Sequence, residues 1–267
     1  KNYSHGQFQS VYDYPYLSSS ANHIFDLTVG FDESSPLSGS ASPVQETKKL
    51  NMYNQFSQVL LGYTGSTNRV RLFESDLTLD ESSGDVMREA VFVNISRLLT
   101  KDEIKKGSVS ITLGTASWAD PFSGVKTFTD SDASNTGGTL STVGGDYGVL
   151  SSSTAGVAGV VFYQAGVMVL TSSIWTGTTD FFSQSGTARD FDNQLVSGSM
   201  SGSADAFRHR LQNLQFNNST EINSTVYFCR APHNKFNYSS NPTYLNAGAI
   251  RVKNNVRSNP PIAYATT

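Results

Sequence analysis

Cysteine, charge and long hydrophobic runs are all scarce in this chain of 267 residues. The single cysteine, Cys229, excludes an intrachain disulfide. Charged residues make up only 15% of the chain and leave a net charge of −3, whereas a nucleic-acid groove needs a basic surplus. No stretch reaches the ~18 apolar residues that a membrane helix requires. We therefore expect neither nucleic acid nor a membrane as a partner.

Recognisable catalytic and cofactor motifs are missing as well. The 4 histidines lie in no pattern that places a base beside a nucleophile, and no Gly-rich phosphate-binding loop occurs. Cys229 and His233 have the spacing of half a zinc site, but a structural zinc takes about four ligands and the chain has no second cysteine. We expect a buried cysteine at the end of a strand, and no catalytic residue, cofactor or metal site.

Two Asp-x-Asp pairs remain as candidates for a cation. Asp130 precedes Asp132, and Asp190 precedes Asp192, each pair in a stretch rich in Gly and Ser. Calcium takes about six to eight oxygen ligands, and neither pair continues into a full calcium-binding loop. We expect solvated turn residues at these positions, with a loosely bound cation as the alternative.

Aromatic residues and glycine are abundant in place of charge. The chain has 16 Phe, 12 Tyr and 22 Gly, a composition that excludes a disordered chain and a coiled coil. We expect a mainly β (α+β) fold: an antiparallel β-sandwich-like domain with two or three short helices and long Gly/Ser-rich loops. Residues 1–30 would form an extended N-terminal arm and the first strand. Residues 31–267 would form a single β-rich domain with a long loop insertion at 114–156.

Hydrophobic periodicity predicts the main elements of this domain. Residues 44–61 repeat apolar side chains at helical spacing, and Gly62 offers a stop. Residues 90–95 read as a buried strand, and residues 109–113 alternate as a strand with one wet face. Two further apolar strands, 157–163 and 167–171, would be joined by a tight turn at Gly166.

Capping signals predict two short helices. Thr100 with Glu103 has the form of a capping box, and Gly107 would close that helix. Ser203 would cap a second helix, whose apolar side carries Phe207, Leu211 and Leu214. A long strand with Ile222, Val226 and Phe228 on or near one face is expected to follow.

Two groups of side chains are candidates for contacts with other proteins. They are Tyr12, Tyr14, Tyr16, Arg208, Arg210 and Arg230. The tyrosines lie on the extended arm, which packs either on its own core or on a neighbouring subunit. The arginines belong to the one basic cluster, which is either a solvated helix face or a partner for acidic residues of a neighbouring copy.

Three stretches of the sequence carry a resemblance to known proteins. They are residues 14–27, which begin Tyr-Pro-Tyr-Leu-Ser-Ser-Ser-Ala-Asn-His, residues 98–107, and residues 216–252. They resemble a group of large virion structural proteins of tailed bacteriophages, notably marine and T4-like contractile-tailed phages. The resemblance reaches both ends and the middle of the chain but not 114–156. In that group the chain continues further, so we expect the full chain to extend beyond residue 267.

The resemblance implies a non-enzymatic structural subunit of the tail, baseplate or neck, assembled in the bacterial host cytoplasm and located in the virion. Its partners would be other copies of itself in a symmetric ring and other virion structural proteins. Charge-poor surfaces rich in aromatics suit such contacts, because each ring buries ~150–250 Å². Two alternatives stay open. One is a host-receptor or glycan-binding module using tyrosines, amides, Trp118 and Trp175, and the other is a polysaccharide-degrading hydrolase with a carboxylate pair.

Overall fold

The computed structural model describes residues 1–14, 21–40, 42–65, 69–81 and 84–229, together with 241, 243, 245–246, 249–251 and 264–266. The chain forms two compact units, Lys1–Glu221 and Ile222–Thr267. The boundary therefore lies at residue 221 and not after residue 30. The strands β1 (Gln9–Asp13) and β2 (Asn22–Phe31) pair with each other and belong to the main sheet of the first unit.

The other strands of the first unit are β3 (Phe73–Glu74), β4 (Val86–Met87), β5 (Glu89–Ile95), β6 (Glu103–Ile104), β7 (Ser110–Gly114), β8 (Val125–Thr129), β9 (Leu140–Thr142), β10 (Gly145–Ser152), β11 (Gly156–Phe162), β12 (Val167–Thr171), β13 (Phe182–Gln184), β14 (Thr187–Arg189), β15 (Leu211–Gln215) and β16 (Asn218–Ser219). Its helices are α1 (Pro43–Leu60), α2 (Arg97–Thr100), α3 (Phe191–Ser197) and α4 (Met200–Arg210), with 3-10 turns η1 (Pro121–Ser123), η2 (Ser131–Ser134) and η3 (Ser172–Trp175). The second unit contains a small antiparallel sheet of β17 (Leu245–Asn246), β18 (Ala249–Arg251) and β19 (Tyr264–Thr266).

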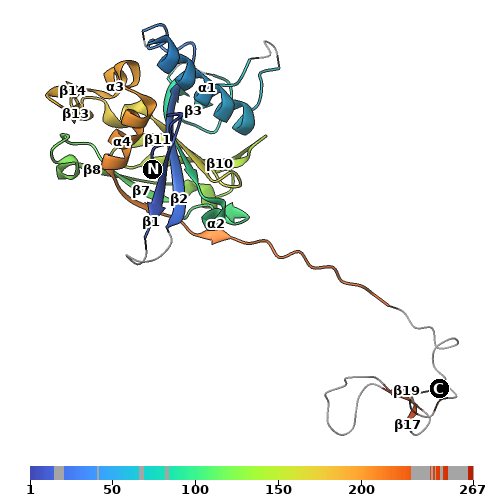
Figure 1. Ribbon diagram of the computed structural model, residues 1–267. Helices are drawn as coiled ribbons and strands as arrows, with labels where there is room; N and C mark the ends of the chain where they lie inside the picture. Colours follow the sequence, from blue (N-terminus) through green and yellow to red (C-terminus); the bar gives the residue numbers. More distant parts are fainter. Residues whose placement is uncertain are drawn as a thin grey trace. The chain divides into compact units, whose positions relative to one another are not determined.

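One antiparallel sheet carries most of the first unit (Figure 1). Its strands run in the order β1-β2-β5-β12-β11-β10-β8-β7-β15, and β9 pairs with β10. The sheet curls, so that side chains from β2 and β5 line the same core as side chains from β7 and β8. The expected mainly β, antiparallel fold with few helices is confirmed. Its two facing layers are parts of one continuous sheet.

The central strand β5 divides its side chains between two cores, because alternate residues of a strand point to opposite faces. Val91, Val93 and Ile95 lie in the inner core, within the curl of the sheet. Ala90 and Phe92 lie in the outer core, on the opposite face. All five are buried. The sequence predicts this buried strand correctly from its run of β-branched and aromatic residues.

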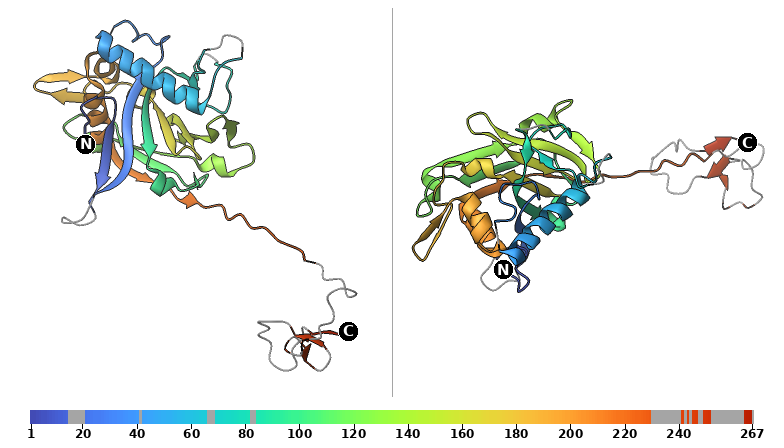
Figure 2. Two further views of the ribbon diagram at one scale, coloured as in Figure 1. Left: turned by 45° about the vertical axis from the view of Figure 1, so that its right-hand side comes forward. Right: turned by 90° about the horizontal axis from the view of Figure 1, so that it is seen from above.

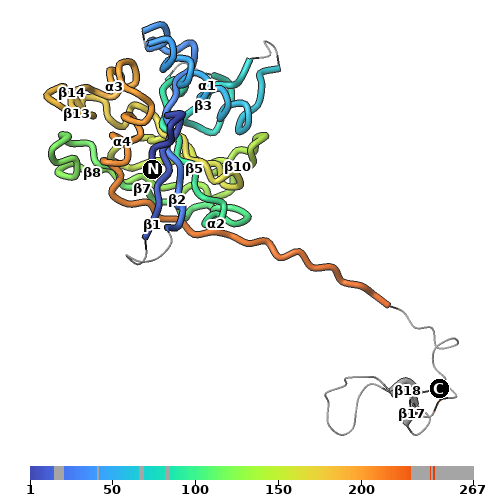
Figure 3. Tube along the Cα trace, in the orientation of Figure 1, coloured from blue at the N-terminus to red at the C-terminus, as the bar shows by residue number. Residues whose placement is uncertain are grey.

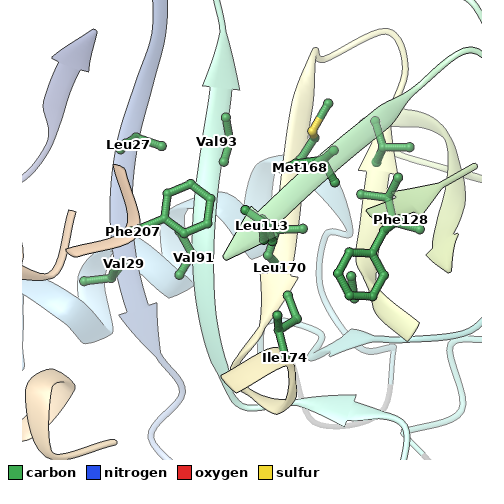
Figure 4. Close-up of a cluster of buried hydrophobic side chains, with 14 of the residues drawn as sticks. Leu27, Val29, Val91, Val93, Leu113, Phe128, Met168, Leu170, Ile174 and Phe207 are labelled. Atoms are coloured by element: carbon green, nitrogen blue, oxygen red, sulfur yellow. The ribbon is translucent and has the colours of Figure 1, made fainter. Parts of the chain in front are cut away.

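The inner core joins the two halves of the curled sheet to helix α4. Figure 4 shows Leu27 and Val29 of β2 in the same cluster as Leu113 of β7, Phe128 of β8 and Phe207 of α4. Helix α4 contacts β1 and β2 at one end of the strand order and leads directly into β15 at the other. The helix therefore connects the two ends of the curled sheet.

Helix α1 covers the outer core, and Figure 2 shows α1 and α4 as two separate helices beside β2. Gly30 permits the close approach of α1, because a Cβ there would lie 2.7 Å from the Lys49 carbonyl oxygen. The predicted helix over 44–61 is confirmed, and Gly62 with a φ of +82° ends it. Its buried face does not follow the apolar side chains strictly, since Lys49 is buried while Val59 is exposed.

Residues 114–156 are not a loop, contrary to the expectation from the sequence. They contain β8, β9 and β10, and these strands belong to the main sheet. Phe128, Tyr147 and Leu150 supply the large buried side chains of this region. The surrounding Ser, Thr and Gly residues carry little hydrophobic signal, so the sequence does not indicate strands that form here by pairing within the sheet.

The helix predicted after Thr100 is also wrong. Helix α2 ends at Thr100, and Glu103 and Ile104 form β6. Ile104 is fully buried in the inner core, and its N–H donates to the Tyr163 carbonyl at 3.0 Å. Burial of Ile104 in extended backbone takes the place of the predicted helical turn.

The helix expected to begin at Ser203 starts earlier and ends earlier. Ser199 caps α4 by accepting a hydrogen bond from the Gly202 N–H at 3.1 Å. The helix ends at Arg210, and Leu211 and Leu214 lie in β15 instead of on a helical face. The hairpin of 157–163 with 167–171 is confirmed as β11 and β12, with Gly166 at a φ of +71°.

A β-bulge at Gly159 changes which side chains of β11 enter the inner core. Ala158 and Val161 lie in the inner core and Val160 in the outer core, a pattern that breaks strict alternation. The pairing of β10 with β11 shifts register at this point. Gly159 has a φ of +148°, and a Cβ there would lie 1.9 Å from the Val169 carbonyl oxygen.

We expect Gly159→Ala to lower the free energy of unfolding by about 3 kcal/mol, because the new methyl group meets backbone in a conformation that favours glycine. Urea denaturation followed by circular dichroism measures this. Gly65→Ala is the control, since a Cβ there meets nothing within 4 Å; its effect should stay within about 0.5 kcal/mol. Equal stability of the two variants would contradict the bulge.

Candidate functional site

Three of the six candidate interface residues come together beside β1, the first strand in the order of the main sheet. Tyr12, Tyr14 and Arg208 line a hollow of about 400 Å³, with Asp205 beside them. The strand β1 places Tyr12 by pairing with β2, and the last turns of α4 place Arg208. Tyr14 follows the end of the strand and is 64% exposed. Two tyrosine rings and an arginine that forms an ion pair with Asp205 therefore share one surface.

Polar contacts fix the β1 edge to its own chain. The Tyr12 hydroxyl lies 3.3 Å from the Tyr3 hydroxyl, and this hydrogen bond raises the pKa of Tyr12. The Arg208 guanidinium lies 3.0 Å from the Asp205 carboxylate, to which the Gln9 amide also donates at 2.7 Å. The arm thus forms the terminal strand of its own sheet, and its first residues fold back along that strand: Asn2 pairs with Gln9, and the Ser10 N–H donates to the Lys1 carbonyl at 3.0 Å.

Arg210 is a correction to the expected basic cluster, because its side chain is fully buried. Its guanidinium donates to the backbone carbonyls of Ala116 at 2.7 Å, Asp180 at 2.9 Å, Phe181 at 3.1 Å and Gly114 at 3.3 Å. Burial lowers the pKa of Arg210. This arginine holds together segments of its own chain and offers no charge to a neighbour. Of the remaining candidates, Tyr16 and Arg230 lie outside the described residues.

A second hollow lies beside β15, the last strand in the order of the main sheet. Figure 3 traces the chain from α4 into β15. The groove, as we call this hollow of about 620 Å³, is lined by Ile24, Phe25, Ile95, Leu99, Ser108 and residues 211–217. Phe25 and Ile95 are buried beneath it, and Leu99, Leu211, Leu214 and Phe216 pack partly exposed against the inner core. The groove therefore has an apolar floor and an amide rim.

Sequence reasoning missed this groove. Leu211 and Leu214 follow Phe207 by four and seven residues, and this helical spacing predicts that all three lie on the apolar side of one helix. The register shift between β15 and β7 at Leu211 and Asn213 brings Leu211 and Leu214 to partly buried positions although their spacing is odd. A pattern shared by helices and bulged strands cannot distinguish the two.

Residues 222–229 carry large apolar side chains into solvent. Ile222, Val226, Tyr227 and Phe228 are 89%, 70%, 85% and 94% exposed. Cys229 is exposed as well, so the expectation of a buried cysteine at a strand end is wrong. No helix or strand is formed over these eight described residues, where the sequence predicts a long strand.

The amide face of α1 lines a third hollow. Asn54 and Gln58 face an open space of about 770 Å³ together with Tyr63, Asp32 and other residues of the neighbouring loops. Tyr63 is half exposed. The hollow combines an aromatic ring with hydrogen-bonding groups of both kinds, as ligands rich in hydroxyl groups require.

The two tryptophans do not form such a surface together. Trp175 is buried in the inner core, stacked on Phe191 with ring centroids 5.2 Å apart. Trp118 is half-buried and contacts the rings of Phe182 and His209. Trp175 is therefore a core residue, and any sugar-binding role for tryptophan would fall to Trp118 alone.

Asp130, expected as a solvated turn residue, is fully buried. Its carboxylate accepts hydrogen bonds from the Gly107 and Val109 N–H groups at 2.8 Å and from the Tyr163 hydroxyl at 3.0 Å. Burial and this carboxylate raise the pKa of Tyr163. Asp190 caps α3. Among the described residues, no group of three or more His, Cys, Asp or Glu is placed to hold a metal ion.

The chain matches no protein-family model, no curated protein and no solved structure. Within the described ranges, no helix has the length and apolar character needed to cross a membrane.

We expect Arg210→Met to lower the free energy of unfolding by about 3 kcal/mol, because it leaves several buried carbonyl groups without their donor. Arg208→Met is the matched control two residues earlier. Its side chain is exposed and forms one surface ion pair, so the change should be below about 1 kcal/mol. Chemical denaturation of both variants measures the difference. A similar small effect for both would mean that Arg210 is not the internal tie described above.

Proposed function

We propose that this chain is a non-enzymatic structural subunit of a tailed-phage virion, in the tail, baseplate or neck, which assembles through protein–protein contacts. The observation that carries the proposal is the exposed apolar segment 222–229. The exposed side chains of Ile222, Val226, Tyr227 and Phe228 within one short segment favour burial against another protein. The resemblance of residues 14–27, 98–107 and 216–252 to phage virion proteins supplies the setting.

The two ends of the main sheet support the same proposal. β15 is the last strand in its order and presents backbone groups along one edge, whereas Lys1 and Asn2 cover the outer edge of β1 at Gln9 and Ser10 and leave only its later residues open. Such edges accept strands from other chains. Tyr14 and Arg208 at the β1 edge add residue types that are enriched in protein interfaces.

We expect the chain to be found in the tail fraction when phage particles that carry it are dissociated and their heads and tails are separated by sedimentation. Mass spectrometry of both fractions measures this, with the major head protein as the internal marker of separation. Several copies per tail would agree with a symmetric assembly. Recovery with the heads alone, or absence from purified particles, would overturn the proposal.

A second candidate function is binding of a host glycan in the hollow beside α1. It is favoured by the amide groups of Asn54 and Gln58, which line the same hollow as the half-exposed ring of Tyr63. Such a module would also belong to a phage tail, at the point of contact with the host.

For this second candidate we expect a glycan array to give hits with the full chain that are lost with Gln58→Ala. The side chain of Gln58 is exposed and lines the hollow. Thr47→Ala, an exposed position on the same helix that does not line the hollow, is the control and should keep the hits. An array without hits removes this candidate and leaves the assembly function as it stands.

A further inference from the structure

Two features of the chain have complementary properties: the groove beside β15 and the exposed segment 222–229. We propose that residues 222–229 of one copy bind in the groove of a second copy, as an additional strand along the free edge of β15. This inference rests on the proposed function, because it names the surface through which copies of the chain would assemble.

The groove has the properties of an acceptor for a strand. On one side β15 pairs with β7, and it is the last strand of the sheet, so its other edge is open along the described residues. The floor beside this edge is apolar, with Phe25 and Ile95 buried and Leu99 and Leu214 half-buried. A strand added there would pair through its backbone and bury alternate side chains on the floor.

The segment has the properties of a donor. In extended backbone, Ile222, Ser224, Val226 and Phe228 share one face, because the side-chain period of a strand is two. The three apolar members of this face are at least 70% exposed. Eight residues at ~3.3 Å each span ~26 Å, which matches the ~23 Å of the seven residues 211–217 that line the groove.

Polarity also agrees between the two surfaces. Neither the lining of the groove nor residues 222–229 include Asp, Glu, Lys or Arg. No ionic group would therefore be dehydrated on contact, which avoids a large cost. The exposed rim residues Gln212, Gln215 and Asn217 are uncharged as well, and Asn223 and Thr225 lie on the opposite face of the segment.

We assign the groove to the segment of a second copy because residues 218–221, just before the segment, are bonded to parts of their own chain other than β15. Asn218 and Ser219 pair with β6, opposite Ile104 and Glu103. The Asn218 side chain donates to the Leu99 carbonyl at 2.9 Å, and the Glu221 N–H donates to the Asp102 carboxylate at 3.0 Å. A return of 222–229 along β15 of the same chain needs a reversal over 216–221, which would break these bonds.

The single cysteine provides a direct test. A full-length chain carrying Cys229→Ser with Gln212→Cys or Gln215→Cys is mixed with the otherwise unaltered chain, which keeps Cys229 and carries a tag of different mass. Both new cysteines lie at exposed rim positions, residue 212 near the start of β15 and residue 215 at its end. Cys229 ends the segment, so it would approach one position or the other according to the direction in which the added strand runs. Val143→Cys with Cys229→Ser is the control, at a position 77% exposed and outside the groove lining.

After mild oxidation, we expect a disulfide between the two kinds of chain from at least one rim position, at a yield about tenfold above the Val143→Cys control. Gel mobility and mass spectrometry of the linked peptides measure it. Rim yields equal to the control would overturn the inference. So would a rim cysteine that links only to Cys229 of its own chain when both are present in one molecule.

Variants of the segment test which of its faces is buried. Val226→Asp should reduce the cross-link to the level of the control, whereas Thr225→Asp should keep it within about twofold, because the neighbouring side chain lies on the opposite face of a strand. Both positions are exposed, so neither change disturbs the fold of the first unit. Equal loss in both variants would contradict strand addition. Loss of the cross-link in a chain that still sediments with tails would refute this inference alone, whereas absence from the tails would refute the assembly function.

Discussion

The curl of one continuous antiparallel sheet around an apolar core is the constraint on which the rest of the first unit depends. Because β2 and β5 share their inner core with β7 and β8, the two ends of the strand order must come near the same helix, α4. The outer face is then left for α1, which approaches closely at Gly30. Burial of apolar surface at ~25 cal/mol per Å² supplies the driving force, and the bulge at Gly159 adjusts the register.

A curled sheet that is not closed by strand pairing keeps two edges. In this chain the edges are unlike: β1 carries Tyr12 and lies beside Arg208 of α4, whereas β15 borders an apolar groove with an amide rim. Buried Arg210 lies at the junction of α4 and β15 and binds carbonyl groups of the segments around it. The junction that leads into β15 therefore contains an internal cation, which the sequence alone would place on the surface.

Part of the fold could be predicted because its signals are local. The β-branched run of β5, the hairpin of β11 and β12 with Gly166, and the helical spacing of α1 with Gly62 are each contained in one short stretch. The strands β8 and β10 could not be predicted in this way, since few large apolar residues mark them and their burial is decided by pairing with distant strands. Leu211 and Leu214 fitted a helical period equally well.

The candidate surfaces were less predictable than the fold. Tyr12 and Arg208 meet at one hollow although 196 positions separate them in the chain, and only the curl of the sheet and α4 bring them together. The burial of Arg210 and the exposure of Cys229 are likewise decided by where helices and strands end. Residue type indicated which side chains suit an interface, and tertiary structure decided which of them reach one.

The absence of ionic side chains from the groove and from residues 222–229 has a consequence for the environment in which such a contact works. Dissolved ions screen the attraction between exposed charges that lie more than a Debye length apart, which is ~8 Å at physiological ionic strength. An apolar and amide surface loses nothing by this, and strongly hydrated anions such as sulfate strengthen burial of its apolar part. Association through β15 would thus persist from dilute buffer to brine.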